Sequence, residues 1–352
     1  MKDKKNPFTI AFGKKPVRFV SRPLQTNGII ENFASETPSS YVYMLTGVRG
    51  SGKTVMMTAI SQSLSAMDEW VPVELNPTRD LLEGLAARLY DRKELQHLFF
   101  EAKINLSAFG IGVSIEGVPP VVDIETAVER MLKTLDKHGK RVLVTIDEVT
   151  NTENMRIFAS AYQILLRQDL PLFLLMTGLY ENIYELQNVD NLTFLYRAPK
   201  VFLKPLNYTA IRSTYQKVFD IESEEAGRMA DLVKGYPFAF QLLGYLYWNE
   251  REYNTLEDII PEFDQYLSEY VYEKIWSEMS ATDRDVAAVI ASENNIAVKD
   301  LRAKIDNMSS EKLSVYRERL KRKGILDTGT YGHLSFVLPR FDEFVKNMQL
   351  YK

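Results

Sequence analysis

The sequence contains no cysteine, and its 352 residues include only three histidines. The missing thiols exclude disulfides, thiolate metal sites and cysteine nucleophiles. His97, His138 and His333 are scattered, which gives little support to a histidine-rich metal site or a Ser-His-Asp triad. A chain without disulfides fits a reducing compartment, and we expect a cytoplasmic protein.

Excess positive charge, long apolar runs and a signal peptide are also missing. The formal net charge of -4 argues against a globally basic nucleic-acid binder but leaves room for a local basic surface. No apolar run approaches the roughly 18 residues of a membrane span, so we expect no membrane partner. The polar start lacks the apolar core of a signal peptide. Length and a hydrophobic content of 45% predict two or three domains with real cores.

A glycine-rich stretch follows the apolar run from Tyr41 to Leu45, which predicts a buried strand. The stretch fits G-x-x-x-x-G-K-[ST] and precedes a helix-compatible run, the context of a phosphate-binding P-loop. Its glycines let backbone N–H groups face phosphate oxygens, while Lys53 would reach the β- and γ-phosphates and Thr54 would bind Mg²⁺. The alternative is a glycine-rich turn without a ligand. The expected ATP-binding residues are Gly47, Val48, Arg49, Gly50, Ser51, Gly52, Lys53, Thr54 and Val55.

A second diagnostic stretch, residues 142–148, is an apolar, β-branched run that ends in Asp147 and Glu148. Such a run predicts a central parallel strand covered on both faces. Ligands of open α/β sheets bind at the carboxyl ends of the strands. We therefore expect Asp147 to bind Mg²⁺ and Glu148 to polarise the attacking water. A strand that ends in a solvated acidic turn is the alternative.

The remaining patterns predict alternating strands and helices up to residue 205 and helices afterwards. Apolar and small residues alternate over 103–118, which suggests a hairpin inserted between helices. The last segment predicts three helices and a β-hairpin with a turn at 327–332, typical of a winged helix-turn-helix. The third helix is locally basic and is either a DNA-reading helix or a solvated face. The DNA-binding candidates are Lys312, Arg317, Arg319, Lys321 and Arg322.

Together these motifs resemble AAA+-related ATPases of the additional-strand class. The resemblance is carried by NPFTIAFGKKP, RFVSRP, TGVRGSGKT, VLVTIDEV, LMTG, FLYRAPKVFLKPL, GYPFAF and the end domain. It covers nearly the whole chain and is to ATP-binding proteins grouped with origin-recognition initiators and STAND nucleotide switches. It implies an α/β fold, a five-stranded parallel sheet in the order 5-1-4-3-2 with helices on both faces, a helical lid and a C-terminal winged helix.

The resemblance also implies roles for residues outside the two motifs. Thr177, at the end of the fourth strand, corresponds to a sensor of the γ-phosphate or attacking water, with a simple strand-end threonine as the alternative. Arg197 corresponds to a catalytic arginine finger, unless it forms a structural ion pair. A segment upstream of the P-loop often covers the adenine, and here it offers Phe19, Val20 and Arg22.

The lid departs from the initiator pattern because the segment from Gly235 to Phe240 contains no arginine. It is closer to the glycine–x–proline signature of STAND proteins, in which Pro237 would approach the base, although Pro237 also suits a plain helix start. The expected domains are an N-terminal arm (1–40), an ATPase core (41–205), a lid with connector (206–279) and a winged helix (280–352).

Three functions compete on the sequence alone. The first is a slow ATPase whose nucleotide state acts on double-stranded DNA. The second is a STAND-type switch acting on a protein partner or on a second copy of the chain. The third is a nucleotide-binding scaffold without turnover.

Overall fold

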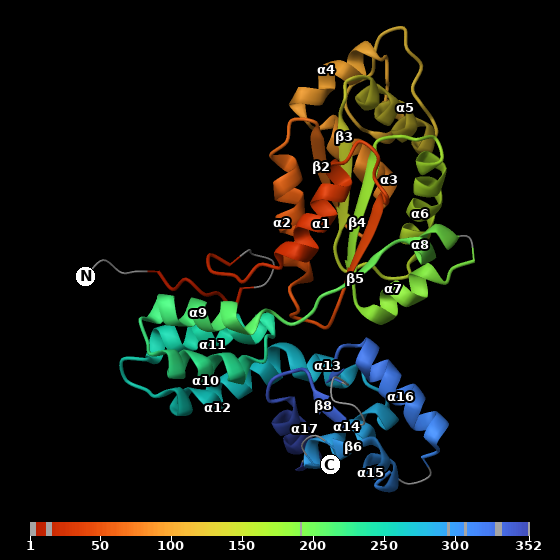
Figure 1. Cartoon of the computed structure of the whole chain (residues 1–352). Coiled ribbons are helices and arrows are strands. Elements are labelled where there is room, and N and C mark those ends of the chain that lie inside the picture. Colours follow the sequence, from red (N-terminus) through yellow and green to blue (C-terminus); the bar gives the residue numbers. More distant parts are fainter. Residues whose placement is uncertain are drawn as a thin grey trace. The chain divides into compact units, whose positions relative to one another are not determined.

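The computed structural model describes residues 5–11, 16–190, 192–293, 296–305, 308–327 and 333–350. Its contacts divide the chain into two compact units, whose elements are labelled in Figure 1. The first unit, called here the helical unit, joins residues 1–22, 47–52 and 203–352. The second, called the sheet unit, joins residues 23–46 and 53–202. The arm, lid and C-terminal segments expected as separate domains thus fall largely within one unit.

The sheet unit is built on five parallel strands. They are β1 (Val42–Thr46), β2 (Trp70–Leu75), β3 (Arg141–Ile146), β4 (Leu172–Gly178) and β5 (Lys200–Phe202). Their order is β2-β3-β4-β1-β5, and every pairing between them is parallel. This confirms the expected order 5-1-4-3-2. Strands β3 and β4 are almost wholly buried, as the apolar run of residues 142–148 predicted for β3.

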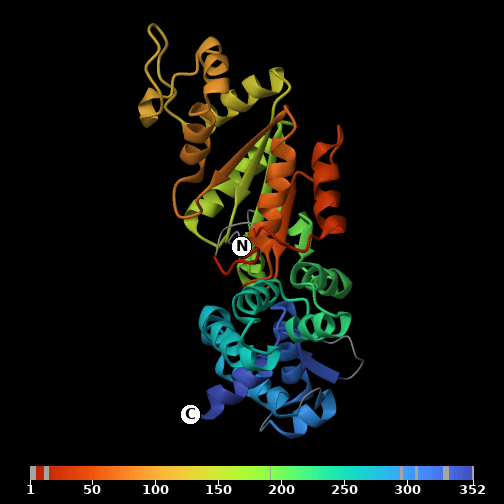
Figure 2. The same ribbon diagram turned by 90° about the vertical axis from the view of Figure 1, so that its left-hand side faces the viewer.

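Helices cover both faces of this sheet (Figures 1 and 2). Val142, Val144 and Ile146 of β3 share a core with helices α3, α5 and α6. On the other face, Phe33 of α1 packs edge-on against Tyr43, at a ring distance of 5.3 Å. The helices of this unit are α1 (Pro23–Ala34), α2 (Lys53–Ser65), α3 (Leu81–Tyr90), α4 (Lys93–Glu101), α5 (Ile124–Lys137), α6 (Glu153–Leu166), α7 (Tyr180–Gln187) and α8 (Thr193–Arg197).

The predicted hairpin at residues 103–118 is wrong. This segment contains a single 3-10 turn, Ser107–Phe109, and no strand. The Asn105 amide donates to the Val118 carbonyl at 2.7 Å, and the Asn105 carbonyl accepts from the Val121 N–H at 2.9 Å. Gly110 and Gly112 both have a φ of +68°. The alternation of small and apolar residues therefore reflects turns around a buried asparagine rather than two paired strands.

The lid of the helical unit consists of α9 (Tyr208–Phe219), α10 (Ser223–Val233), α11 (Pro237–Glu250) and α12 (Leu256–Leu267). The N-terminal arm packs into it. Phe8 is 2% exposed and stacks on Phe219 at 5.4 Å. A Cβ atom on Gly244 of α11 would lie 2.5 Å from the Phe8 ring, so the small residue makes room for the arm. The arm is thus part of the lid core.

The rest of the helical unit follows α12 directly. It comprises a π-helical turn (Ser268–Tyr272), α13 (Glu273–Ser277), α14 (Ala281–Glu293), β6 (Ile296–Ala297), α15 (Val298–Ala303), α16 (Ser310–Arg322), β7 (Leu326–Asp327), β8 (His333–Phe336) and α17 (Phe341–Leu350). Strands β6, β8 and β7 pair antiparallel in that order. The three helices and the two hairpin strands were expected, whereas α17 was not. Residues 328–332 of the predicted turn lie outside the described residues.

Candidate functional site

A hydroxyl and a carboxylate meet in the sheet unit. Thr54 lies in the first turn of α2, and Asp147 directly follows β3. The Thr54 Oγ1 atom donates a hydrogen bond of 2.7 Å to the Asp147 Oδ2 atom. Because the carboxyl ends of parallel strands share one edge of the sheet, the two motifs converge there although they are far apart in the sequence.

Thr177 supports the same acidic pair from the end of β4. Its hydroxyl donates to the Asp147 Oδ1 atom and accepts the Glu148 N–H at 3.1 Å. Thr177 is fully buried. The Thr177 hydroxyl thus links Asp147 to Glu148, and its expected contact with the attacking water stays a prediction.

Glu148 is exposed and has a φ of +53°, in the left-handed region that non-glycine residues rarely adopt. The Glu148 N–H is bonded to both Asp147 and Thr177. These bonds hold the strained backbone, and such strain at the end of a strand is common at functional sites. The two acids therefore differ: Asp147 is held within the cluster, and Glu148 is presented to solvent.

The oxygen donors of this cluster fit Mg²⁺. A threonine hydroxyl and a carboxylate are the hard ligands that Mg²⁺ prefers, and it usually takes only one or two protein carboxylates plus water and substrate phosphates. Within the described ranges there is no group of three His, Asp or Glu side chains that could hold a metal ion without such help. Thr54 and Asp147 would therefore hold the ion.

The glycine-rich loop, residues 47–52, belongs to the helical unit. Gly50 and Gly52 have φ values of +70° and +87°, which explains the need for glycine at both positions. Ser51 is buried, and its hydroxyl has no hydrogen-bond partner among the described residues. An unsatisfied buried hydroxyl is costly unless a ligand or water completes it, so the loop suits a bound anion.

The outer side of this loop contacts the lid and connector. Arg49 forms a 2.8 Å ion pair with Glu278, which directly follows α13. The Tyr236 hydroxyl donates to the Arg49 carbonyl at 2.5 Å, and the Phe238 N–H donates to the Gly50 carbonyl at 3.2 Å. No sequence pattern indicated Tyr236 or Glu278 as a contact of the loop. The motif around Pro237 is the nearest signal, and it indicates the proline rather than its neighbour.

The segment expected to cover adenine lies on the same loop. The Arg22 guanidinium donates to the carbonyls of Ser51 at 3.1 Å and Lys204 at 2.8 Å. Burial lowers the pKa of Arg22 to about 10, which leaves it charged at neutral pH. Val20 packs on the lid core, and Phe19 is 37% exposed. The adenine contacts of these residues stay predictions.

The remaining candidate site residues lie at the ends of three helices: Pro237, Lys53 and Arg197. Pro237 begins α11, and its Cβ lies 3.8 Å from where a Cβ on Gly52 would be. Lys53 begins α2, directly after the loop, and Val55 lies in the same first turn. Arg197 ends α8 and is exposed. Within the described chain no hydrogen bond or ion pair joins Arg197 to Asp147 or Glu148, so its role as an arginine finger stays a prediction.

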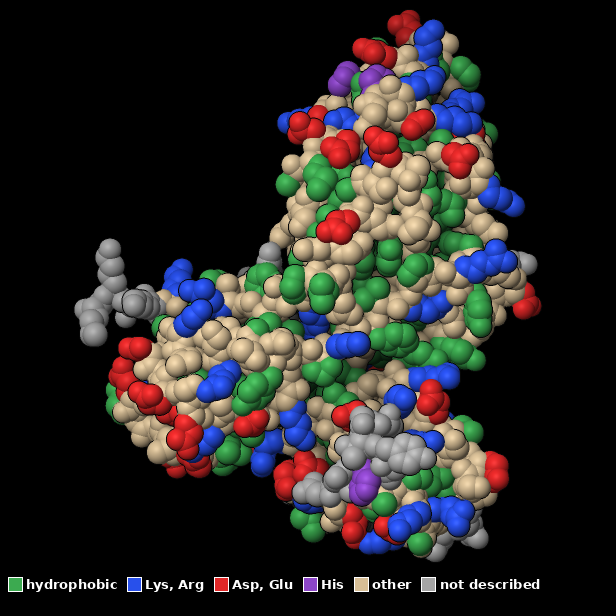
Figure 3. Space-filling view, in the orientation of Figure 1, with side chains coloured by type: hydrophobic (Ala, Val, Ile, Leu, Met, Phe, Trp, Pro, Cys, Tyr) green, Lys and Arg blue, Asp and Glu red, His purple; other side chains and the backbone are tan. Residues whose placement is uncertain are grey.

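An aromatic cluster that no sequence pattern indicated lies on α7 and β5. Hydrophobic side chains reach the surface of the sheet unit in Figure 3. Tyr180 stacks on Tyr184 at 5.9 Å and on Phe202 at 6.2 Å. Tyr184 and Phe202 are about half exposed.

In the described part of the chain, none of the helices combines the length and apolarity needed to cross a membrane.

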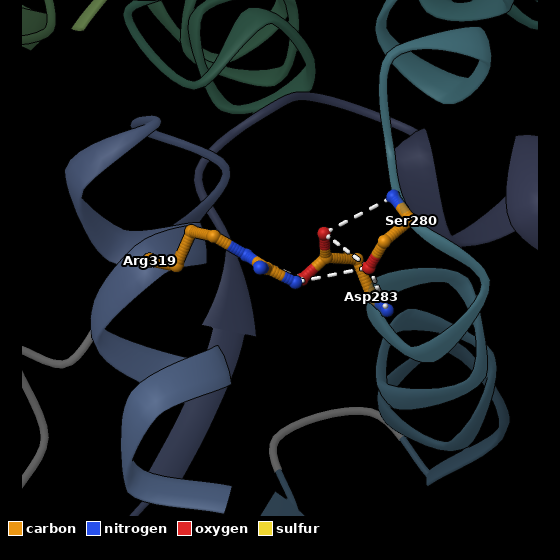
Figure 4. A network of polar contacts seen from close by, with 3 residues as sticks. All are labelled: Ser280, Asp283 and Arg319. Carbon is orange, nitrogen blue, oxygen red and sulfur yellow. Dashed lines mark hydrogen bonds and ion pairs between the residues drawn. The ribbon is translucent and has the colours of Figure 1, made fainter. Parts of the chain in front are cut away.

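The basic residues of α16 do not form one surface. Arg319 donates to Asp283 through Nε at 3.0 Å and to the Ser280 hydroxyl at 2.9 Å (Figure 4). Asp283 is 1% exposed, so releasing Arg319 to DNA would leave a buried carboxylate unpaired. Arg319 thus joins α16 to α14, and this pairing argues against the expected DNA contact.

The other four candidates are partly or fully exposed, but acids lie among them. Lys312, Lys321 and Arg322 are exposed, and Arg317 is half-buried. Arg322 pairs with Glu318 at 2.8 Å, and Glu311 is exposed beside Lys312. The exposed face of α16 thus mixes four basic residues with two acids and remains locally basic.

Solved structures of other proteins share this fold. The ORC2 protein of Aeropyrum pernix, in its ADPNP-ADP complexes, aligns with 97% of this chain and 98% of its own at a TM-score of 0.60 and 12% identity. The chain has the ORC2 fold. The ADP form of ORC2 aligns over 97% of both chains at a TM-score of 0.52 and 12% identity. The α/β architecture expected from the motifs, with its five-stranded parallel sheet, is therefore confirmed at the level of the fold.

Two further comparisons bear on the sequence itself. Residues 269–345 match a family model described as a domain of unknown function (DUF8462). That match begins in the π-helical turn before α13 and ends within α17. A search of curated proteins with the whole sequence finds no match.

Proposed function

We propose that this chain is an ATP-binding, Mg²⁺-dependent ATPase that works as a nucleotide-controlled switch with slow turnover. One observation carries the proposal: the hydroxyl of Thr54, from the phosphate-binding motif, bonds to Asp147, from the acidic strand end. A glycine-rich turn without a ligand gives no reason for this contact. The ORC2 protein, whose fold the chain shares, was solved with ADPNP and ADP, which supports the choice of adenine nucleotide.

Each of these residues has a role that follows from the chemistry of its side chain. Lys53, which directly follows the loop, would neutralise developing charge on the β- and γ-phosphates. Thr54 and Asp147 would hold Mg²⁺, which supplies further charge neutralisation when bound. Glu148 accepts a proton from the attacking water, and its exposure leaves room for that water. Thr177 keeps the two acids in place, and Arg197 would stabilise charge on the transferred phosphoryl group.

A turnover assay tests the chemical step. Glu148→Gln should retain ATP binding and lose at least about 100-fold in turnover, since a positioned general base contributes roughly 10²- to 10⁴-fold. Glu153→Gln, an exposed acid in the first turn of α6, is the matched control and should hydrolyse ATP as the unaltered chain does. Equal turnover in the Glu148 variant would remove this residue from its role. An unaltered chain that binds ATP without turnover would instead favour a nucleotide-binding scaffold.

For the partner, the ion pairs that engage Arg319 and Arg322 favour a protein-directed switch over a DNA-coupled ATPase. We propose that β6 to β8 and α14 to α16 form a winged helix whose exposed face contacts a protein or a second copy of this chain. DNA binding through Lys321 would instead show a steep fall of affinity with salt, because each phosphate contact releases counterions. If duplex DNA binds, and Lys321→Ala flattens the salt dependence by about one phosphate contact while Ser314→Ala does not, the DNA-coupled function replaces this one.

A further inference from the structure

Three consecutive carbonyls of the glycine-rich loop accept hydrogen bonds from outside the loop. The Arg49 carbonyl accepts from the Tyr236 hydroxyl, and the Gly50 carbonyl accepts from the Phe238 N–H. The Ser51 carbonyl accepts from Arg22. The donors come from the lid and the arm, and all of these groups lie within the helical unit.

The direction of these carbonyls fixes the direction of the loop amides. In a trans peptide the C=O of one residue and the N–H of the next point in opposite directions. The N–H groups of Gly50 and Gly52 therefore point away from Tyr236 and Arg22. The Ser51 N–H bonds within the loop, to the Val48 carbonyl at 3.3 Å. Outward carbonyls and inward amides are the geometry of an anion-binding nest.

Tyr236 makes the closest of these contacts. A Cβ atom on Gly50 would lie 2.3 Å from the Tyr236 hydroxyl oxygen, so the ring and the glycine fit together without space between them. Tyr236 is 4% exposed, and burial raises its pKa well above the usual range. The hydroxyl therefore remains protonated and acts as a hydrogen-bond donor throughout the physiological pH range.

We propose that Tyr236 is a positioning residue for phosphate binding: its hydroxyl orients the loop so that the Gly50 N–H faces the nucleotide phosphates. This proposal rests on the proposed ATP-binding function and assigns Tyr236 no contact with the nucleotide. It also separates Tyr236 from Pro237, which is expected to approach the base. Loss of the Tyr236 hydroxyl should weaken binding of the phosphates and leave the preference among bases unchanged.

The test is titration calorimetry of Tyr236→Phe with ATP, ADP and GTP in the presence of Mg²⁺. The variant keeps the ring and removes only the donor. We expect ATP and ADP to bind roughly fivefold more weakly, by similar factors, as for the loss of one ordinary hydrogen bond. The ratio of ATP to GTP affinity should stay as in the unaltered chain.

Tyr215→Phe is the matched control. Tyr215 is buried in the same lid, and its hydroxyl donates to the Phe240 carbonyl at 2.7 Å. The Tyr215→Phe substitution removes the same kind of hydrogen bond from a part of the lid that does not contact the loop. Nucleotide affinity should therefore be unchanged. Arg22→Met, which removes the donor to the Ser51 carbonyl, is a second variant and should weaken ATP and ADP by a common factor.

The outcomes separate this inference from the function on which it rests. Unchanged ATP affinity in Tyr236→Phe, or an equal loss in Tyr215→Phe, would overturn the positioning role alone. A changed ATP to GTP ratio would also overturn it, because Tyr236 would then act on the base. An unaltered chain that binds none of the nucleotides would overturn the proposed function as well.

Discussion

The Thr177 hydroxyl donates a hydrogen bond to the Asp147 carboxylate, which also accepts one from Thr54. Three segments that are distant in the sequence thus meet at one carboxylate: the start of α2, the end of β3 and the end of β4. This meeting holds Asp147 at the carboxyl edge of the sheet, and each of its two threonine partners can be removed separately.

Thr177→Val should lower turnover by roughly tenfold to 100-fold with little change in ATP affinity. Valine has a similar shape but removes the bonds of the Thr177 hydroxyl to Asp147 and to the Glu148 N–H. A hydrogen bond to a charged group contributes about 1.5–3 kcal/mol. Steady-state kinetics separate kcat from KM. Thr145→Val, which alters another buried threonine on β3, is the control and should leave kcat unchanged. A Thr177 variant with full kcat would show that the hydroxyl has no positioning role.

Asp147→Asn should weaken the dependence of ATP binding on Mg²⁺. The amide can still bond to Thr54 but carries no charge and is a poorer Mg²⁺ ligand. Calorimetric titration of ATP with and without Mg²⁺ should show a smaller gain from the metal than in the unaltered chain. If the gain were the same, Asp147 would not be a metal ligand.

Arg319→Ala should destabilise the helical unit by roughly 2 kcal/mol. Removing one partner of a buried pair costs about 3–5 kcal/mol, and the partial exposure of Arg319 reduces this value. Lys321→Ala, two residues later on the same helix, is exposed and should change stability by less than about 0.5 kcal/mol. Denaturant unfolding measures both. Similar stabilities for the two variants would mean that the Asp283 pair contributes little.

Gly244→Ala and Gly227→Ala should act in opposite directions. Both glycines lie inside lid helices, where alanine is favoured by about 1 kcal/mol. At Gly244 the new methyl would collide with the Phe8 ring, and overpacking costs about 1–3 kcal/mol. The nearest atom to a Cβ at Gly227 is 3.5 Å away, an ordinary contact. Thermal unfolding should show a lower Tm for Gly244→Ala and a higher one for Gly227→Ala; two increases would mean that Phe8 does not occupy this space.

The sequence predicted the sheet and the two motifs because their signals are local. β3 and β4 are apolar on both faces, a pattern that a short stretch of sequence shows by itself. The order of the strands followed from the resemblance rather than from any single pattern. The order is confirmed by the four parallel pairings between neighbouring strands.

Contacts between distant residues could not be predicted in the same way. The basic run of α16 looked uniform, yet Arg319 turns to an aspartate 36 residues earlier. The alternation at 103–118 looked like strands, because nothing in the pattern showed that Asn105 would bond across the loop. The contacts of Tyr236 with the glycine-rich loop span 187 residues. Each of these depends on tertiary packing, which a periodicity does not encode.

The most direct test of the account is titration calorimetry of Lys53→Ala with ATP and Mg²⁺. Lys53 directly follows the glycine-rich loop and begins α2, so its removal takes away the cation expected at the β- and γ-phosphates. We predict measurable ATP binding by the unaltered chain and none by the variant, with both chains equally folded by circular dichroism. Equal ATP affinity in the two chains would contradict the assignment of the loop as a phosphate-binding site.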